Sequence, residues 1–317
     1  MESPQITKRR LKGAHNIKQI TKAMELVAAT KMRKSQEIAL LSRPYAFAAL
    51  ELLANIGRAI TGTSLHHPLL TARTGTKTAL VVITSDKGLA GSFNSSVLKA
   101  VDMFLAERPD FETSPDHTPI AIGQKAANYL ERRLGRVTHS FTRVGDYTTT
   151  EHIRPIAELI IAGYLDGRWD RVVVFSTHFK SALRQEVIDR QILPVDVELI
   201  QETAKEIIPE TGRFAELLKE HGASFFTHTS TRPTEYLFEP SAESVLADLA
   251  HHLVLMQLYH VVLEANASEH AARRMAMKNA SDNAGGIIDT LTLEYNKSRQ
   301  ASITRELTEL TAGASAL

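Results

Sequence analysis

The chain has 317 residues, of which 43% are apolar, so it is long enough for two domains and can bury a sizeable core. It contains no cysteine, which excludes structural disulfides, thiolate metal sites, a cysteine nucleophile and dithiol redox switching. No apolar run approaches the roughly 20 residues that a membrane-spanning helix needs.

Positive charge is concentrated in the first segment. Residues 1–34 carry nine basic and two acidic residues, a net charge of about +7, although the whole chain is only +1. A basic arm on a nearly neutral protein usually has an anionic partner, such as nucleic acid, anionic lipid or acidic protein loops. A solvated helix face is the alternative, with equal weight. No aromatic residue precedes Tyr45, which weakens the case for stacking on nucleic-acid bases.

Residues 1–62 are predicted to form a long helix, which Pro44 should bend or break. Apolar side chains recur at 3-4 spacing, which is typical of a coiled-coil seam. Lys31 and Lys34 interrupt this seam. Its predicted positions are Ile17, Ile20, Met24, Val27, Ile38, Leu41, Tyr45, Ala48 and Leu52.

Residues 75–200 alternate between strand and helix patterns, which favours a parallel-type, Rossmann-like α/β domain. Buried strands are predicted at Thr78–Thr84, Pro119–Gly123 and Val172–Ser176, and a strand or hairpin at 184–199. Helices are predicted at about 93–107, from Gly123 to about Leu134, and at 150–166. Residues 200–233 are polar, contain prolines and glycines, and are interpreted as an insertion with one short helix.

Residues 234–317 are predicted to form a second long helix, from about 241 to 311. At 1.5 Å per residue such a helix would be roughly 105 Å long, which no compact domain of this size encloses. Two helices of this kind, one at each end of the chain, can bury their seams against each other as an antiparallel pair. The seam positions are Leu246, Leu249, Leu253, Met256, His260, Leu263, Met277, Ala284, Ile288, Leu291 and Tyr295.

Three local patterns invite a chemical interpretation. The turn Ser85–Gly91 follows a strand where a phosphate-binding loop would lie, but it lacks GxxxxGK[ST] and GxGxxG and is interpreted as a tight turn. His260 and Glu264 lie one helical turn apart, as metal ligands can, but a structural histidine is favoured. Gly285-Gly286 inside the last helix indicates close helix packing or a flexible point, and packing is favoured.

Long segments at both ends resemble one family. Ile20–Lys34 (ITKAMELVAATKMRK) is very similar to the N-terminal signature of ATP synthase γ subunits. Ala271–Gly285 (AARRMAMKNASDNAG) and Tyr295–Leu310 (YNKSRQASITRELTEL) resemble the C-terminal stretch of that family, and Asp86–Gly91 matches its D-x-GL-x-G turn. The matches cover about a third of the chain in the right order.

The resemblance implies a non-catalytic central-stalk subunit of a proton-translocating F-type ATP synthase. The terminal helices would turn inside a ring of α and β subunits, and the α/β domain would lie against the ε subunit and the membrane c-ring. Catalysis would belong to the β subunits, with no cofactor, metal or nucleic acid bound here. The expected place is the cytoplasmic face of the bacterial inner membrane, reached only through the complex. The expected contacts with the ring are Lys22, Met24, Lys31, Arg33, Lys34, Arg299, Gln300 and Thr304.

Two other functions are considered beside this one. A nucleotide-binding α/β enzyme would need a glycine-rich phosphate loop, which the sequence lacks. A coiled-coil adaptor for nucleic acid would need base-stacking aromatic residues and a larger basic excess. The resemblance does not extend to residues 200–233, where most bacterial members of the family are shorter. Plant members carry a regulatory cysteine pair in about this region, which a chain without cysteine cannot form.

Overall fold

The computed structural model describes residues 4–41, 52, 67–145, 148–195 and 238–315. The chain divides into two compact units, which we call the helical unit (residues 1–29 with 273–317) and the sheet unit (residues 30–272). The predicted insertion at 200–233, and the predicted first helix beyond Leu41 apart from residue 52, lie outside the described residues. The domain boundaries expected from the sequence stay a prediction.

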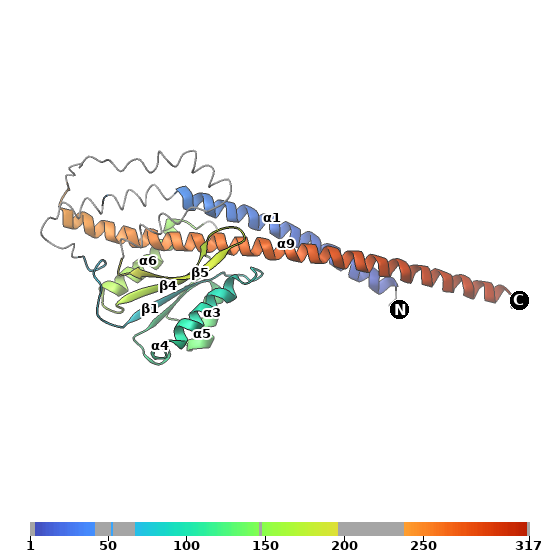
Figure 1. Cartoon of the computed structure of the whole chain (residues 1–317), viewed down its shortest axis with the longest axis horizontal. Helices are drawn as coiled ribbons and strands as arrows, with labels where there is room; N and C mark the ends of the chain where they lie inside the picture. The colour runs from blue at the N-terminus through green and yellow to red at the C-terminus, as the bar shows by residue number, and fades with distance from the viewer. Residues whose placement is uncertain (1–3, 42–51, 53–66, 146–147, 196–237, 316–317) are drawn as a thin grey trace. The chain divides into compact units, whose positions relative to one another are not determined.

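The two terminal helices are present and long. Helix α1 spans Pro4–Leu41 and helix α9 spans Ala242–Ser315, 74 residues without a break (Figure 1). Helix α9 contains an 18-residue window apolar enough to cross a membrane, with a mean hydropathy of 1.3, but 67% of that window is buried inside the protein. Such burial is typical of the core helix of a globular domain.

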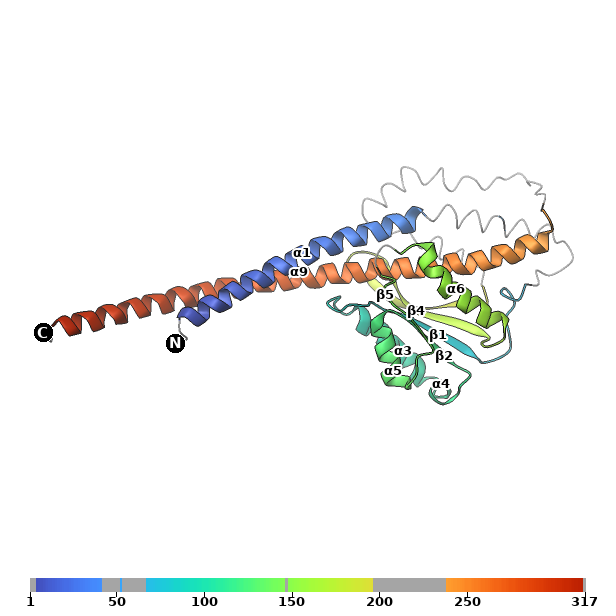
Figure 2. The ribbon, with the colours of Figure 1, turned by 180° about the vertical axis from the view of Figure 1, so that it is seen from behind.

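Within the helical unit, α1 and α9 pack antiparallel. Leu11 and Ala14 cluster with Ile288 and Leu291, while Lys18, further along α1, approaches Gly285, which lies earlier in α9. Residues later in α1 therefore pack against residues earlier in α9, which is the arrangement of an antiparallel pair. Both views show the two helices side by side (Figures 1 and 2).

The predicted seam of α1 is wrong by one residue over residues 20–27. Ile17, Ile20 and Val27 are more than half exposed, whereas Thr21, Glu25 and Ala28, each one residue after a predicted position, are buried. Ile38 and Leu52 of the predicted seam do pack against the core of the sheet unit. A shift of one residue turns the buried face by about 100°. Small and polar side chains on this face let the backbones approach, while the large apolar ones remain outside. The buried residues of α1 are Thr7, Ala14, Thr21, Glu25, Ala28, Met32 and Ala39.

The predicted seam of α9 is confirmed. Residues 257–271 are buried all round, as in a helix enclosed by a core, so the positions outside this stretch are the ones that test which stripe is buried. Met256 and Tyr295 are half-buried. The buried seam residues are Leu246, Leu249, Leu253, His260, Leu263, Met277, Ala284, Ile288 and Leu291.

The sheet unit contains a five-stranded sheet in the order β3-β2-β1-β4-β5. The first four strands are parallel, and β5 runs antiparallel to β4 at the edge. The predicted parallel-type sheet is confirmed, and the segment predicted as a strand or hairpin forms the second arm of the β4–β5 hairpin. The strands are β1 (Thr78–Ile83), β2 (Thr118–Ile122), β3 (His139–Phe141), β4 (Arg171–Phe179) and β5 (Gln185–Leu193).

Helices cover both faces of this sheet (Figures 1 and 2). Side chains of β1 alternate between the two faces. Val81 packs with α6 (Thr150–Leu165) and α9, and Val82 packs with α3 (Phe93–Ala106) and α5 (Gln124–Leu134). The sequence analysis missed β3 and the one-turn helix α4 (Asp110–Thr113) because three or four mixed residues carry no readable period.

Candidate partner-contact surface

Exposed apolar side chains follow one face of α1. Ile17 and Ile20 are 55% and 59% exposed and Val27 is 55% exposed, with the half-buried Met24 between them. These are the residues that the sequence analysis assigned to the helix seam. Since another face of α1 packs against α9, this stripe remains available to a partner, and contiguous exposed apolar surface commonly marks an interaction site.

Basic residues flank this stripe, and two of them are paired locally. Lys22 Nζ lies 2.9 Å from Glu25 Oε2, and Lys34 Nζ lies 3.6 Å from Glu37 Oε2. The exposed Lys34–Glu37 pair contributes at most about 1 kcal/mol, so a stronger acidic partner could displace it, whereas the Glu25 side chain is only 11% exposed. Arg33 is exposed.

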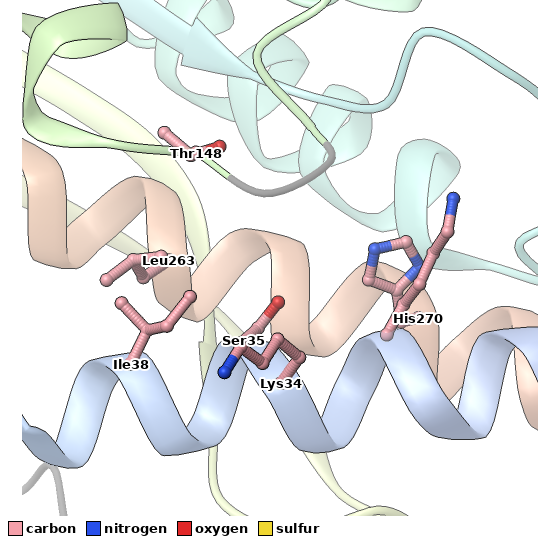
Figure 3. Close-up of a pocket in the computed structure, with 7 residues that line it drawn as sticks. Lys34, Ser35, Ile38, Thr148, Leu263 and His270 are labelled. Atoms are coloured by element: carbon pink, nitrogen blue, oxygen red, sulfur yellow. The ribbon is translucent and has the colours of Figure 1, made fainter.

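Lys31 and Lys34 also line an open pocket of the sheet unit, with an empty volume of about 250 Å³ that includes open solvent (Figure 3). Ser35 and Ile38 of α1 lie on one side, and α9 contributes the remaining helical wall. Two lysines predicted to contact a partner therefore border a recess of their own chain. The rest of the lining is Leu263 and His270 of α9 and Thr148 from the loop before α6.

At the far end of α9, Arg299, Gln300 and Thr304 are exposed. Thr304 Oγ1 donates to the Gln300 carbonyl at 2.9 Å, so this hydroxyl is satisfied within the helix. Among the residues that the structure describes, Arg299 has no acidic partner within ion-pair distance. A planar guanidinium in this position can bind a carboxylate of another chain through two hydrogen bonds.

Within the helical unit, Lys22 and Met24 do not lie beside Arg299, Gln300 and Thr304. In the antiparallel pairing of the helical unit, Lys22 and Met24 lie opposite about residue 279 of α9. Residues 299–304 follow about 20 residues later, which is roughly 30 Å along a helix. They would form two separate points of contact. The assignment of all eight residues as ring contacts stays a prediction.

The glycine turn after β1 serves the fold. The Asp86 carboxylate accepts hydrogen bonds from the backbone N–H groups of Gln124 (3.0 Å) and Arg143 (2.8 Å). It thereby ties together the loops that follow β1, β2 and β3. Asn94 at the start of α3 accepts from the Ser85 N–H at 3.0 Å. These bonds support the interpretation as a structural turn.

One buried ionic cluster was missed by the sequence analysis. Glu264, considered there with His260, accepts a hydrogen bond from His178 Nδ1 at 3.0 Å and lies 3.5 Å from Arg190 Nη1. Burial raises the pKa of the Glu264 carboxyl, but the His178 hydrogen bond and the Arg190 charge outweigh it and hold that pKa below its usual value. In the described ranges, no group of three or more histidine or acidic side chains is arranged to hold a metal ion.

Comparison with known proteins agrees with the arrangement of the helices and sheet. The sequence model of the ATP synthase family matches residues 3–317. The chain is 38% identical to the ATP synthase gamma chain of Roseiflexus castenholzii over 324 residues, covering 100% of this chain and 99% of the relative.

Two solved structures share the fold. One is a chain from the central stalk and c-ring of the Tetrahymena thermophila mitochondrial ATP synthase, with a TM-score of 0.55, 23% identity and coverage of 83% of this chain and 99% of that one. The other is from the OSCP, F1 and c-ring assembly of the Euglena gracilis enzyme, with a TM-score of 0.60, 19% identity and coverage of 99% and 94%. The match to the family model and the full-length relative establish that this chain belongs to the ATP synthase gamma chain family.

Proposed function

We propose that this chain is the rotating central shaft of a proton-translocating F-type ATP synthase. Its terminal helices turn inside a ring of α and β subunits and couple ion flow to ATP synthesis or hydrolysis. The chain itself is non-catalytic and binds no cofactor, and the chemistry takes place on the β subunits.

One observation carries this proposal: the apolar surface at the end of α9. In the antiparallel pairing, Pro4 of α1 lies opposite a residue near Ser298, so later residues of α9 have no described residue of α1 opposite them. Three apolar side chains in this part of α9 are accordingly exposed: Ile303 by 48%, Leu307 by 57% and Leu310 by 71%. Apolar side chains on an otherwise solvated helix gain free energy when a partner covers them. An apolar collar formed by the ring would provide that cover.

The predicted polar contacts fit the same role. Arg299 and Gln300 are exposed and would bind acidic loops of the β subunits in turn as the shaft rotates. The basic residues of α1 would form a second contact whose strength falls with salt, made by Lys22, Lys31, Arg33 and Lys34. Charged contacts with surface loops suit a rotor, because they can be broken and remade at each step.

The remaining assignments extend this proposal. Residues 1–62 and 234–317 form the shaft, residues 75–200 the α/β domain, and residues 200–233 an insertion in it. The α/β domain would contact the ε subunit and the c-ring at the cytoplasmic face of a bacterial membrane. The chain would reach that membrane only through the complex.

Co-purification tests the proposal directly. An affinity-tagged chain, expressed in its own cells, is expected to bring α and β subunits with it in a fixed ratio. Calorimetry on the isolated chain is expected to detect neither ATP binding nor hydrolysis. Stoichiometric ATP binding by the isolated chain, or purification without α and β, would contradict a purely mechanical role.

A further inference from the structure

A strip of polar side chains interrupts an otherwise apolar contact between α9 and the sheet. Gln257, His260, Glu264 and Ser268 recur at spacings that place them along one face of the helix, and all four are buried. Leu253 and Val261, nearby on the same helix, belong to the apolar core. The strip therefore lies inside the packed interface of the sheet unit.

The strip is bonded to two different strands. Glu264 Oε2 is 3.0 Å from His178 Nδ1 on β4 and 3.5 Å from Arg190 Nη1 on β5. The side chains of His178, Arg190 and Glu264 are only 6 to 7% exposed. One turn further along the helix, Ser268 Oγ donates to the Thr177 carbonyl at 3.4 Å. A helix near the end of the chain and both strands of the β4–β5 hairpin thus meet at one carboxylate.

Stability alone does not account for this cluster. Removing charges from water is costly, and replacing a buried ion pair by apolar residues of similar volume is often neutral or stabilising. Several buried atoms of this region, namely both amide atoms of Gln257 and the Ser176 hydroxyl, also have no hydrogen-bond partner among the described residues. Hydrogen bonds and ion pairs are directional, so they can favour one rotational setting of α9 on the sheet, which apolar packing does not.

The bonds from Glu264 to β4 and β5 fix how α9 is rotated on the sheet. An apolar helix can roll or slide on an apolar surface with little loss of contact area. If α9 rolled on the sheet, however, Glu264 would move away from β4 and β5 together, and a charge would be left buried without its partners. The cluster therefore penalises rotation of α9 about its own axis far more than the surrounding leucines do.

We propose that Glu264, held by His178 and Arg190, is a positioning residue that locks the rotational setting of α9 on the sheet. The lock carries torque between the sheet and the helix that continues toward Ser315. This inference rests on the proposed function, because only a rotor needs to resist twisting at this point.

The test compares three variants in the assembled, membrane-bound complex. The first is Glu264→Gln, which keeps the shape of the side chain and removes its charge. The second replaces the whole cluster by apolar residues, Glu264→Met with Arg190→Met and His178→Leu. The matched control is Asp248→Asn, which removes a carboxylate from an exposed position of the same helix.

The readout is the number of protons pumped per ATP hydrolysed in sealed vesicles, measured beside the thermal unfolding of each complex. The apolar variant is expected to unfold at about the wild-type temperature while pumping several-fold fewer protons per ATP. Glu264→Gln is expected to fall between it and the wild type, and Asp248→Asn to match the wild type. If the cluster had only a structural role, replacing it would change the unfolding temperature and leave the number of protons pumped per ATP unchanged.

Two results would overturn the inference. One is an assembled apolar variant that pumps at the wild-type ratio. The other is failure of both the apolar variant and Glu264→Gln to assemble, which would make the cluster a requirement for folding instead. Failure of the wild-type chain to co-purify with α and β subunits is a different result, which counts against the proposed function and is recorded before any variant is tested.

Discussion

Truncating the exposed leucines at the end of α9 should lower the affinity of the chain for the ring without lowering the stability of the isolated chain. Leu307 and Leu310 are 57% and 71% exposed. Burying a whole leucine side chain contributes about 1.5–3 kcal/mol, so covering these exposed fractions contributes roughly 1–2 kcal/mol each. The double variant Leu307→Ala with Leu310→Ala should therefore lose about 2–4 kcal/mol of binding free energy, or about thirty-fold to several-hundred-fold in affinity.

The assay is reconstitution from purified subunits. The chain is titrated into α and β subunits, and half-saturation is read from the ATP hydrolysis that assembly confers. The isolated double variant should unfold at the wild-type temperature, because alanine is at least as good a helix former as leucine and no buried contact is lost.

Ile288→Ala serves as the matched comparison, since Ile288 is 8% exposed and packs within the helix pair. It should destabilise the isolated chain by about 2–4 kcal/mol through the cavity it leaves. If the double leucine variant bound the ring as tightly as the wild type, the exposed end of α9 would not be the part that the ring covers, and the observation behind the proposed function would fail.

Further predictions follow from individual residues. Arg299→Ala with Gln300→Ala should leave the complex assembled but lower ATP hydrolysis at saturating substrate several-fold, and wild-type turnover would contradict a role in force transmission. Gly123→Ala should destabilise the chain strongly in thermal unfolding, since Gly123 has φ +99° and an added Cβ would lie 2.1 Å from the Thr84 carbonyl oxygen. Gly286→Ala should raise the free energy of unfolding by up to about 1 kcal/mol, and with it the unfolding temperature, because nothing lies within 4 Å of the added carbon. If the variant instead loses coupling between ATP hydrolysis and rotation, Gly286 is a flexible point of the shaft. Dithiol reductants should not change activity, as the chain has no cysteine.

Much of the fold could be predicted because it depends on local periodicity. In Thr78–Ile83 every residue after the threonine is apolar and every position is buried, as expected for a strand covered on both faces, and the predicted seam residues of α9 recur at 3-4 spacing over many turns. The two ends of the chain also carry long motifs, which identified the family. Short elements such as β3, with three residues, carry too few positions for any period to appear.

The contact surface could be predicted only in part. The sequence indicated basic and exposed residues on both terminal helices, and the structure leaves Arg299 and Gln300 exposed. It could not indicate that Lys31 and Lys34 border a pocket with Leu263 and His270, because those residues come from opposite ends of the chain.

Periodicity and motifs, then, were enough to determine the helices, the alternating strands and the family of this protein. Tertiary structure decided which face of α1 is buried, because two neighbouring stripes compete and only packing favours the one with Ala14 and Ala28 over the one with Ile17 and Ile20. It also decided the partners of Glu264, since His178 and Arg190 lie 86 and 74 residues away in the sequence. Spacing along a helix reports neighbours on that helix, whereas contacts between distant segments exist only once the chain has folded.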